Sequence, residues 1–208
     1  MTDLSGSWLW YLMRASGVVS LILFSLVFAL GIAATARVRV RGLPRFATAA
    51  LHGSLALLSV VFLAIHVGTA LADPYAEVRV VDAVVPFTAR SHALALGLGV
   101  LSADLIVALV VTSLLRHRIG LRSWRAIHLV AYLSWPIAVV HTLGEGSDTS
   151  QPWMLAVLVG SIGLVAVSVI ARMLGRADPT RPPAAGRRFS VPAVATPEQG
   201  SRLHSDPR

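Results

Sequence analysis

Five apolar stretches, each long enough to cross a lipid bilayer, constrain this chain more than any other feature of its sequence. They run over residues 7–34, 46–71, 91–115, 124–143 and 153–174. A helix needs about 20 predominantly apolar residues to span the hydrocarbon core. Only 13% of the 208 residues are charged, against about 25% in an ordinary soluble domain. We therefore predict an all-α integral membrane protein, a bundle of five transmembrane helices.

The arginines in the connecting segments predict how the bundle is oriented. Residues 37–45 and 116–125 carry four arginines each, whereas 73–90 holds two arginines with three acids, and 144–152 holds no basic residue. Cytoplasmic loops carry an excess of basic residues. We therefore place the first two segments and the C-terminus in the cytoplasm, the N-terminus outside, and the protein in the cell membrane as a multi-pass protein. Inner and outer are used here in the sense of this predicted orientation.

Two segments fall outside the spans. Residues 78–87 are too short and too interrupted to cross a bilayer, so they form either an amphipathic piece on the outer interface or an ordinary ordered loop. Residues 176–208 are rich in Pro, Ala, Gly, Ser and Arg without apolar periodicity. We predict a disordered basic cytoplasmic tail there, able to touch anionic lipid, after a transmembrane domain of residues 1–175.

The charge and the lack of cysteine exclude several classes of function. The net charge is +8, all basic residues are arginine, and there is no cysteine. The arginines lie in loops and in the tail rather than along one helix face, which indicates membrane topology and not nucleic-acid binding. Without cysteine there are no thiolate metal sites or cysteine-held iron–sulfur clusters. Any redox metal must be held by histidine or carboxylate.

Four histidines within the spans are the candidate site. His52 and His66 lie in the second span, and His128 and His141 lie in the fourth. At about 1.5 Å rise per residue, the two histidines of one helix are roughly 20 Å apart. The two spans run in the same direction, so His52 and His128 share the inner side while His66 and His141 share the outer side. Such side chains are costly inside a membrane and point to function.

Two imidazoles at each depth suit a metal that brings its other ligands with it. Haem iron has two axial positions open to histidine, whereas zinc takes three or four protein ligands in one cluster. We therefore predict two b-type haems, an inner one on His52 and His128 and an outer one on His66 and His141. Each histidine taken alone can instead be an interhelical hydrogen-bond donor.

Helical phase supports one helix better than the other. At about 100° per residue, fourteen steps bring His66 to within roughly 40° of His52. Thirteen steps leave His128 and His141 about 140° apart on an ideal helix. Pro136 lies between them and can kink or rotate the helix, but the sequence alone does not fix whether it corrects the phase.

The histidine spacings resemble those of a known family. His52-x13-His66, His128-x12-His141, the basic segment 116–128 that leads into the fourth span, and the stretch 73–87 together resemble the ferric reductase-like transmembrane domain, also found in NADPH oxidases. The resemblance covers roughly residues 46–143 and implies haem ligation by these histidines despite the shorter second gap. Fuller members continue into flavin and nicotinamide domains, but no G-x-G-x-x-G or βαβ pattern occurs here.

The predicted function is that of a membrane b-type cytochrome that passes electrons across the bilayer. A separate flavoprotein reductase, quinol or a partner subunit would be the donor, and a ferric chelate, oxygen, a quinone or a redox protein the acceptor. Two alternatives are a haem-bearing membrane anchor of a soluble oxidoreductase and a haem-free small transporter subunit. Homo- and hetero-oligomers are both compatible with the sequence.

Other polar residues keep two interpretations each. Arg14 either snorkels to the outer surface or neutralises a propionate of the outer haem. Asp104 either relays protons or hydrogen-bonds to Ser102 or to a facing helix. Arg45 and Arg125 bind inner propionates or serve only as topology charges.

Two further residue types have open roles. His92, at the start of the third span, is a spare ligand or substrate contact or has neither role, whereas His117 and His204 are expected to be solvated. Gly53 and Gly68 stand next to histidines, where small residues either admit a flat macrocycle or serve helix packing.

Overall fold

Five long apolar helices form the molecule, as shown by a computed structural model that describes residues 4–36, 45–146 and 148–176. The spans are formed by α1 (Leu4–Ala36), α2 (Arg45–Ala72), α3 (Ala93–Leu114), α5 (Leu121–His128) together with α6 (Ala131–Glu145), and α7 (Pro152–Arg176), and the short elements are η1 (Val80–Ala83) and α4 (Arg116–Ile119). The predicted all-α, multi-pass membrane architecture is confirmed. The predicted tail lies outside the described residues.

Local sequence explains where the spans begin and end. In lipid every backbone N–H and C=O must be satisfied within the segment, and an uninterrupted apolar helix does this. The third helix ends at Leu114, directly before the arginines of α4. The last helix begins at Pro152, and proline is favoured at the first helical position because its missing N–H has no helical partner there.

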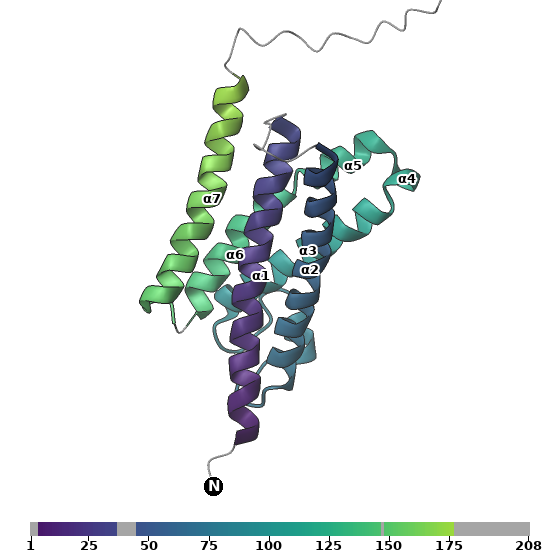
Figure 1. The fold of residues 1–208 in the computed structure, drawn as a ribbon. Coiled ribbons are helices and arrows are strands. Elements are labelled where there is room, and N and C mark those ends of the chain that lie inside the picture. The colour runs from purple at the N-terminus through teal and green to yellow at the C-terminus, as the bar shows by residue number, and fades with distance from the viewer. Residues whose placement is uncertain (1–3, 37–44, 147, 177–208) are drawn as a thin grey trace, which may run out of the picture. The chain divides into compact units, whose positions relative to one another are not determined.

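The helices pack mainly as two pairs (Figure 1). The first pair is α1 with α2 and the second is α3 with α6, while α7 packs against α1. A buried apolar cluster joins α1, α6 and α7, formed by Leu21, Phe24, Trp135, Val139, Met154, Leu158 and Val165. Within it the Trp135 indole N–H donates to Ser25 Oγ at 2.9 Å. This cluster fixes α6 beside α1 and leaves the facing sides of α2 and α6 for the histidines.

A tightened turn interrupts the fourth span and shifts its helical phase. Between α5 and α6, Val130 N–H donates to the carbonyl of Ile127 and Leu133 N–H to that of Val130, both i to i+3 hydrogen bonds. Such 3₁₀ backbone turns about 120° per residue instead of about 100°. The five steps from His128 to Leu133 can add at most about 100°, which is most of the roughly 140° that an ideal helix lacks. This shift precedes Pro136, which lies inside α6.

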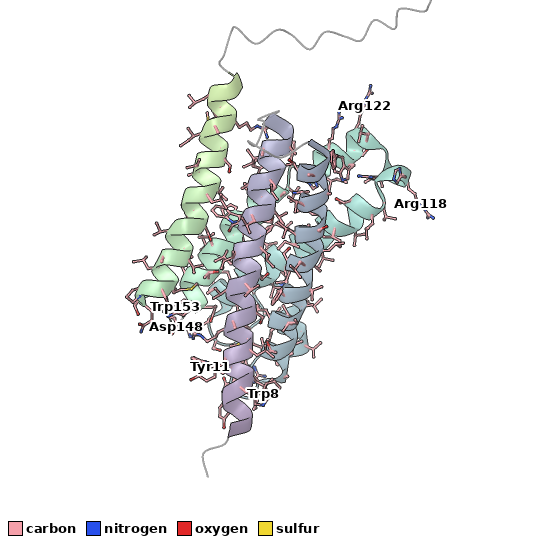
Figure 2. All side chains as sticks on the ribbon, viewed as in Figure 1. Trp8, Tyr11, Arg118, Arg122, Asp148 and Trp153 are labelled. Carbon is pink, nitrogen blue, oxygen red and sulfur yellow. The ribbon has the colours of Figure 1, made fainter. Side chains whose placement is uncertain are left out.

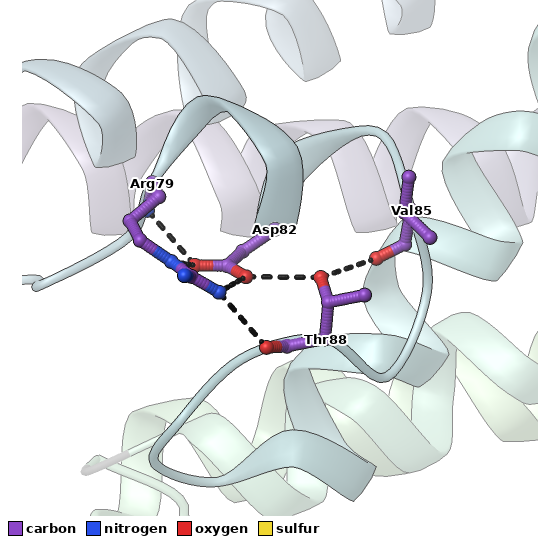
Figure 3. A network of polar contacts seen from close by, with 4 residues as sticks. All are labelled: Arg79, Asp82, Val85 and Thr88. Atoms are coloured by element: carbon purple, nitrogen blue, oxygen red, sulfur yellow. Dashed lines mark hydrogen bonds and ion pairs between the residues drawn. The ribbon is translucent and has the colours of Figure 1, made fainter.

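The loop between α2 and α3 is ordered around a buried carboxylate (Figure 3). Asp82, only 2% exposed, accepts hydrogen bonds from Arg79 Nε at 2.8 Å and Nη2 at 2.6 Å, and from Thr88 Oγ1 at 2.9 Å. These bonds, above all those from Arg79, hold the pKa of Asp82 below its usual range. The loop exposes Val80 and Val84. It is thus an ordered loop with an apolar outer surface, and its place at the membrane interface stays a prediction.

The exposed arginines of α4 and α5 lie at one end of the bundle. Figure 2 shows Arg118 and Arg122 at this end, and Tyr11, Asp148 and Trp153 toward the other end. A cluster of arginines at one end matches the basic cytoplasmic side of membrane proteins. The orientation itself stays a prediction.

Candidate functional site formed by two histidine pairs

The structure brings the four span histidines together in two pairs. The ring centroids of His52 and His128 are 6.4 Å apart with the ring planes at 71°, and those of His66 and His141 are 6.4 Å apart at 73°. One member of each pair comes from α2 and the other from α5 or α6. The pairs are the ones expected from depth, although their role as ligands stays a prediction.

The spacing within each pair suits one metal ion between two imidazoles. A metal bound in line by two imidazole Nε2 atoms, at about 2.0–2.1 Å from each, would separate the ring centroids by roughly 6–6.5 Å. Among the described residues, no group of three or more His, Asp or Glu side chains could hold a metal ion. Each pair thus offers two ligands, which is the number that a haem iron takes from a protein.

Three of the four imidazoles are fixed by backbone carbonyls of a neighbouring helix. The Nδ1 contacts are those of His52 with Val27 O at 3.0 Å, His66 with Met13 O at 2.8 Å and His141 with Ala95 O at 2.8 Å. A carbonyl oxygen only accepts, so Nδ1 carries the proton and donates. The Nε2 lone pair is therefore left free, as in a metal-binding histidine supported by its second nitrogen.

Glycine makes the room for each of these three rings. Gly31, Gly17 and Gly99 stand four residues after the three accepting carbonyls. A Cβ on them would lie 3.2 Å from His52, 2.9 Å from His66 and 2.6 Å from His141. We name this combination, a carbonyl followed one turn later by glycine, the glycine cradle. Any larger residue would crowd the imidazole.

The sequence analysis missed these glycines and considered others. A Cβ on Gly53 or Gly68 would have nothing within 4 Å, so neither glycine makes room for an imidazole. One signal was available: Gly17 and Gly31 are fourteen residues apart, the same spacing as His52 and His66. On two adjacent antiparallel helices, equal spacings bring each glycine beside one histidine.

The fourth histidine is held differently. His128 Nδ1 is buried and has no hydrogen-bond partner within the described part of the chain. Instead the ring of Trp124 stacks on it, with centroids 4.9 Å apart and planes at 27°. The indole N–H of Trp124 donates to Ser113 Oγ at 3.2 Å. Like the three cradle glycines, Trp124 is a site residue that was not identified from the sequence alone.

A cavity of about 360 Å³ opens beside the outer pair, and both His66 and His141 line it. This volume falls within the range of ligand pockets, about 300–1,000 Å³. Its walls are mostly apolar and come from α1, α2, α3, α6 and α7, whereas Arg14, Glu145 and Asp148 give it a charged edge. The outer pair therefore has adjoining space and charge for a group larger than a bare ion.

One ion pair and one histidine–carboxylate contact lie at or beside this cavity. Arg14 pairs with Asp148 and lies over the ring of Trp10, 4.5 Å from its centroid. His92 Nδ1 lies 3.7 Å from Glu145 Oε1, with 70% of its side chain exposed. The structure thus places Arg14 in the cavity lining and His92 at the outer rim, apart from the histidine pairs.

The remaining polar residues lie away from the pairs. Asp104 is exposed midway along α3. Of the alternatives for this residue, a bond from Ser102 is not formed, because Ser102 Oγ donates to Ser134 O at 2.9 Å. Arg125 and His117 are exposed. The Arg45 side chain and His204 lie outside the described residues.

Comparison with known proteins gives one match. The family described as ferric reductase like transmembrane component matches residues 16–139, more than half of the chain. This range includes His52, His66 and His128 and ends two residues before His141. No curated protein and no solved structure matches.

Proposed function

We propose that this chain, which belongs to the ferric reductase-like transmembrane family, is a b-type cytochrome that passes electrons across the membrane. Family membership makes it a membrane electron-transfer component. The finer proposal is an inner haem b on His52 and His128 and an outer haem b on His66 and His141. The observation that carries it is the equal 6.4 Å separation of the rings in both pairs.

Haem iron, when bound, supplies one-electron chemistry whose potential depends on axial ligands, burial and nearby charge. The chain provides these controls. The carbonyls of Val27, Met13 and Ala95 orient three imidazoles and raise their basicity by accepting the Nδ1 protons. At the outer cavity the guanidinium of Arg14 carries positive charge that suits a carboxylate. In this structure the carboxylate that pairs with it is that of Asp148.

A separate electron donor belongs to the proposal. We expect a flavoprotein reductase or quinol on the inner side and an acceptor on the outer side, in a homo- or hetero-oligomeric assembly. A haem-bearing anchor of a soluble oxidoreductase is the second candidate, favoured by the arginines exposed on α4 and α5, where an acidic protein surface would dock. Reduction of an outside acceptor by the purified chain in liposomes with an enclosed reductant separates the two, since an anchor has no turnover of its own.

The experiment that tests the proposal is a haem count with a reduced-minus-oxidised spectrum of the detergent-purified protein from haem-supplied cells. We expect two low-spin haems per chain. His66→Ala or His141→Ala should each remove the outer haem and leave the inner one. A colourless protein would refute the proposal, and retention of both haems in both variants would refute the pairing.

A further inference from the structure

His128 of the inner pair is held differently from the other three histidines, and the residue spacings along α1 and α3 show how. On α1 the two accepting carbonyls, of Met13 and Val27, are fourteen residues apart. On α3 the first is that of Ala95, and fourteen residues later comes Leu109. No histidine donates to its carbonyl, because His128 Nδ1 has no hydrogen-bond partner in the described part of the chain. A fourth glycine cradle is therefore not formed on α3.

The residue in place of the glycine is Ser113, fourteen positions after Gly99. Ser113 has a hydroxymethyl side chain at the position where the other three cradles have glycine. Ser113 Oγ accepts the indole N–H of Trp124, and the face of that indole lies on His128. A chain from serine through tryptophan to histidine thus replaces the direct bond from histidine to backbone.

We propose that Trp124 is the positioning residue of His128, so that within the inner pair His128 is held by this stacked contact while His52 is held by a glycine cradle. The inference rests on the proposed function and adds to it a difference between the two sites. His128 is the last residue of α5 and is followed by the 3₁₀ turn. Its backbone is less constrained than that of a residue inside a long helix, so the stacked indole fixes the ring plane.

Stacking and hydrogen bonding act differently on a metal ligand. A carbonyl that accepts the Nδ1 proton raises imidazole basicity and fixes rotation of the ring. Stacking limits the tilt of the ring but does not polarise its N–H. Of the four histidines, His128 would therefore hold a haem iron most weakly, and a haem held by the inner pair would lose this histidine more readily than a haem held by the outer pair would lose either of its own.

The test uses the haem-loaded full chain and carbon monoxide as the probe of ligand exchange. Trp124→Leu removes the stack, Trp124→Phe keeps an aromatic face but loses the bond to Ser113, and Ser113→Ala removes the acceptor. Trp8→Leu is the matched control, because Trp8 is 55% exposed at the far end of α1. Spin state, carbon monoxide binding to the reduced protein and a redox titration are recorded for each.

We expect two low-spin haems and little carbon monoxide binding in the unchanged protein and in Trp8→Leu. In Trp124→Leu about half of the haem should become high-spin and bind carbon monoxide, with the other half unchanged as proof of folding. Trp124→Phe should restore most of the low-spin signal, and Ser113→Ala should give a smaller effect of the same kind.

Two results would overturn the inference without touching the proposed function. One is Trp124→Leu with both haems low-spin and carbon monoxide binding as in the unchanged protein. If that variant does not accumulate, Ser113→Ala decides, and an inner haem identical to the unchanged one is the contrary result. An unchanged protein without haem would instead be a failure of the proposed function.

Discussion

Replacing Gly99 by alanine tests most directly how the outer pair is held. The new Cβ would lie 2.6 Å from both Nδ1 and Cε1 of His141. Ordinary van der Waals contact begins near 3.4 Å, so the ring must retreat by about 0.8 Å. Its hydrogen bond to Ala95 O, at 2.8 Å, lies on the same side and would lengthen with that movement.

The expected magnitude follows from three contributions. Overpacking costs about 1–3 kcal/mol, and the weakened hydrogen bond costs about 0.5–1.5 kcal/mol. Alanine in place of glycine inside a helix returns about 1 kcal/mol. The free energy of unfolding should therefore fall by about 0.5–3.5 kcal/mol, and loss of the second-nitrogen bond should lower outer haem affinity by about 10- to 100-fold.

The assay is the haem count with the reduced-minus-oxidised spectrum after dilution of the purified protein. Gly99→Ala should fall from two haems toward one, with the inner haem retained. Gly17→Ala should lose less and Gly31→Ala almost nothing, because their Cβ distances rise to 2.9 and 3.2 Å. Gly68→Ala is the matched control, since nothing lies within 4 Å of its Cβ.

Two outcomes would refute this reasoning. Gly99→Ala with two firmly bound haems and an unshifted spectrum would show that the ring is not confined between α3 and the metal position. Equal haem loss in Gly68→Ala would show that the effect comes from helix propensity or from expression rather than from the cradle.

Three other residues give further predictions. Because Arg79 lowers the pKa of Asp82, the contribution of the Asp82 carboxylate to loop stability is complete above the ordinary carboxyl pKa of about 3.9 and is lost as the pH falls below that value. Hydrogen exchange of residues 79–88, corrected for the intrinsic pH dependence of exchange, should show this loss, and Asp82→Asn should abolish the pH dependence. Asp104→Leu should improve membrane insertion of residues 93–114 by about 3 kcal/mol in a translocon insertion assay, and equal insertion would contradict a position of Asp104 in the hydrocarbon core. Trp135→Phe should lower the free energy of unfolding by about 1–2 kcal/mol through the lost bond to Ser25 and lost packing, measured by thermal unfolding against Trp8→Phe, for which no change is expected.

The helix-spanning architecture could be predicted because it depends on each segment alone. An apolar run of about 20 residues must form its own backbone hydrogen bonds in lipid, whatever its neighbours are. The pairing of His52 with His128 and of His66 with His141 by depth followed from direction and rise per residue. Apolar length and distance along a helix axis both depend only on residue position, so they can be calculated from the sequence.

The contacts across helices had to come from the tertiary structure. The angle between His128 and His141 around the helix axis depends on the i to i+3 hydrogen bonds formed in the turn at residues 126–133. No residue type in that turn predicts a 3₁₀ segment. The ion pair of Arg14 with Asp148 joins α1 to the turn between α6 and α7, 134 residues apart. Such partners are set by packing distances rather than by local preference.

The membrane spans and the relative depth of the histidines could be predicted from the sequence, because burial in lipid and helical rise act on one segment at a time. How each imidazole is held came only from the packed helices. The glycine cradles of His52, His66 and His141 are close approaches between different helices. The stack of Trp124 on His128 lies within α5, but the bond from Trp124 to Ser113 that anchors it reaches across to α3.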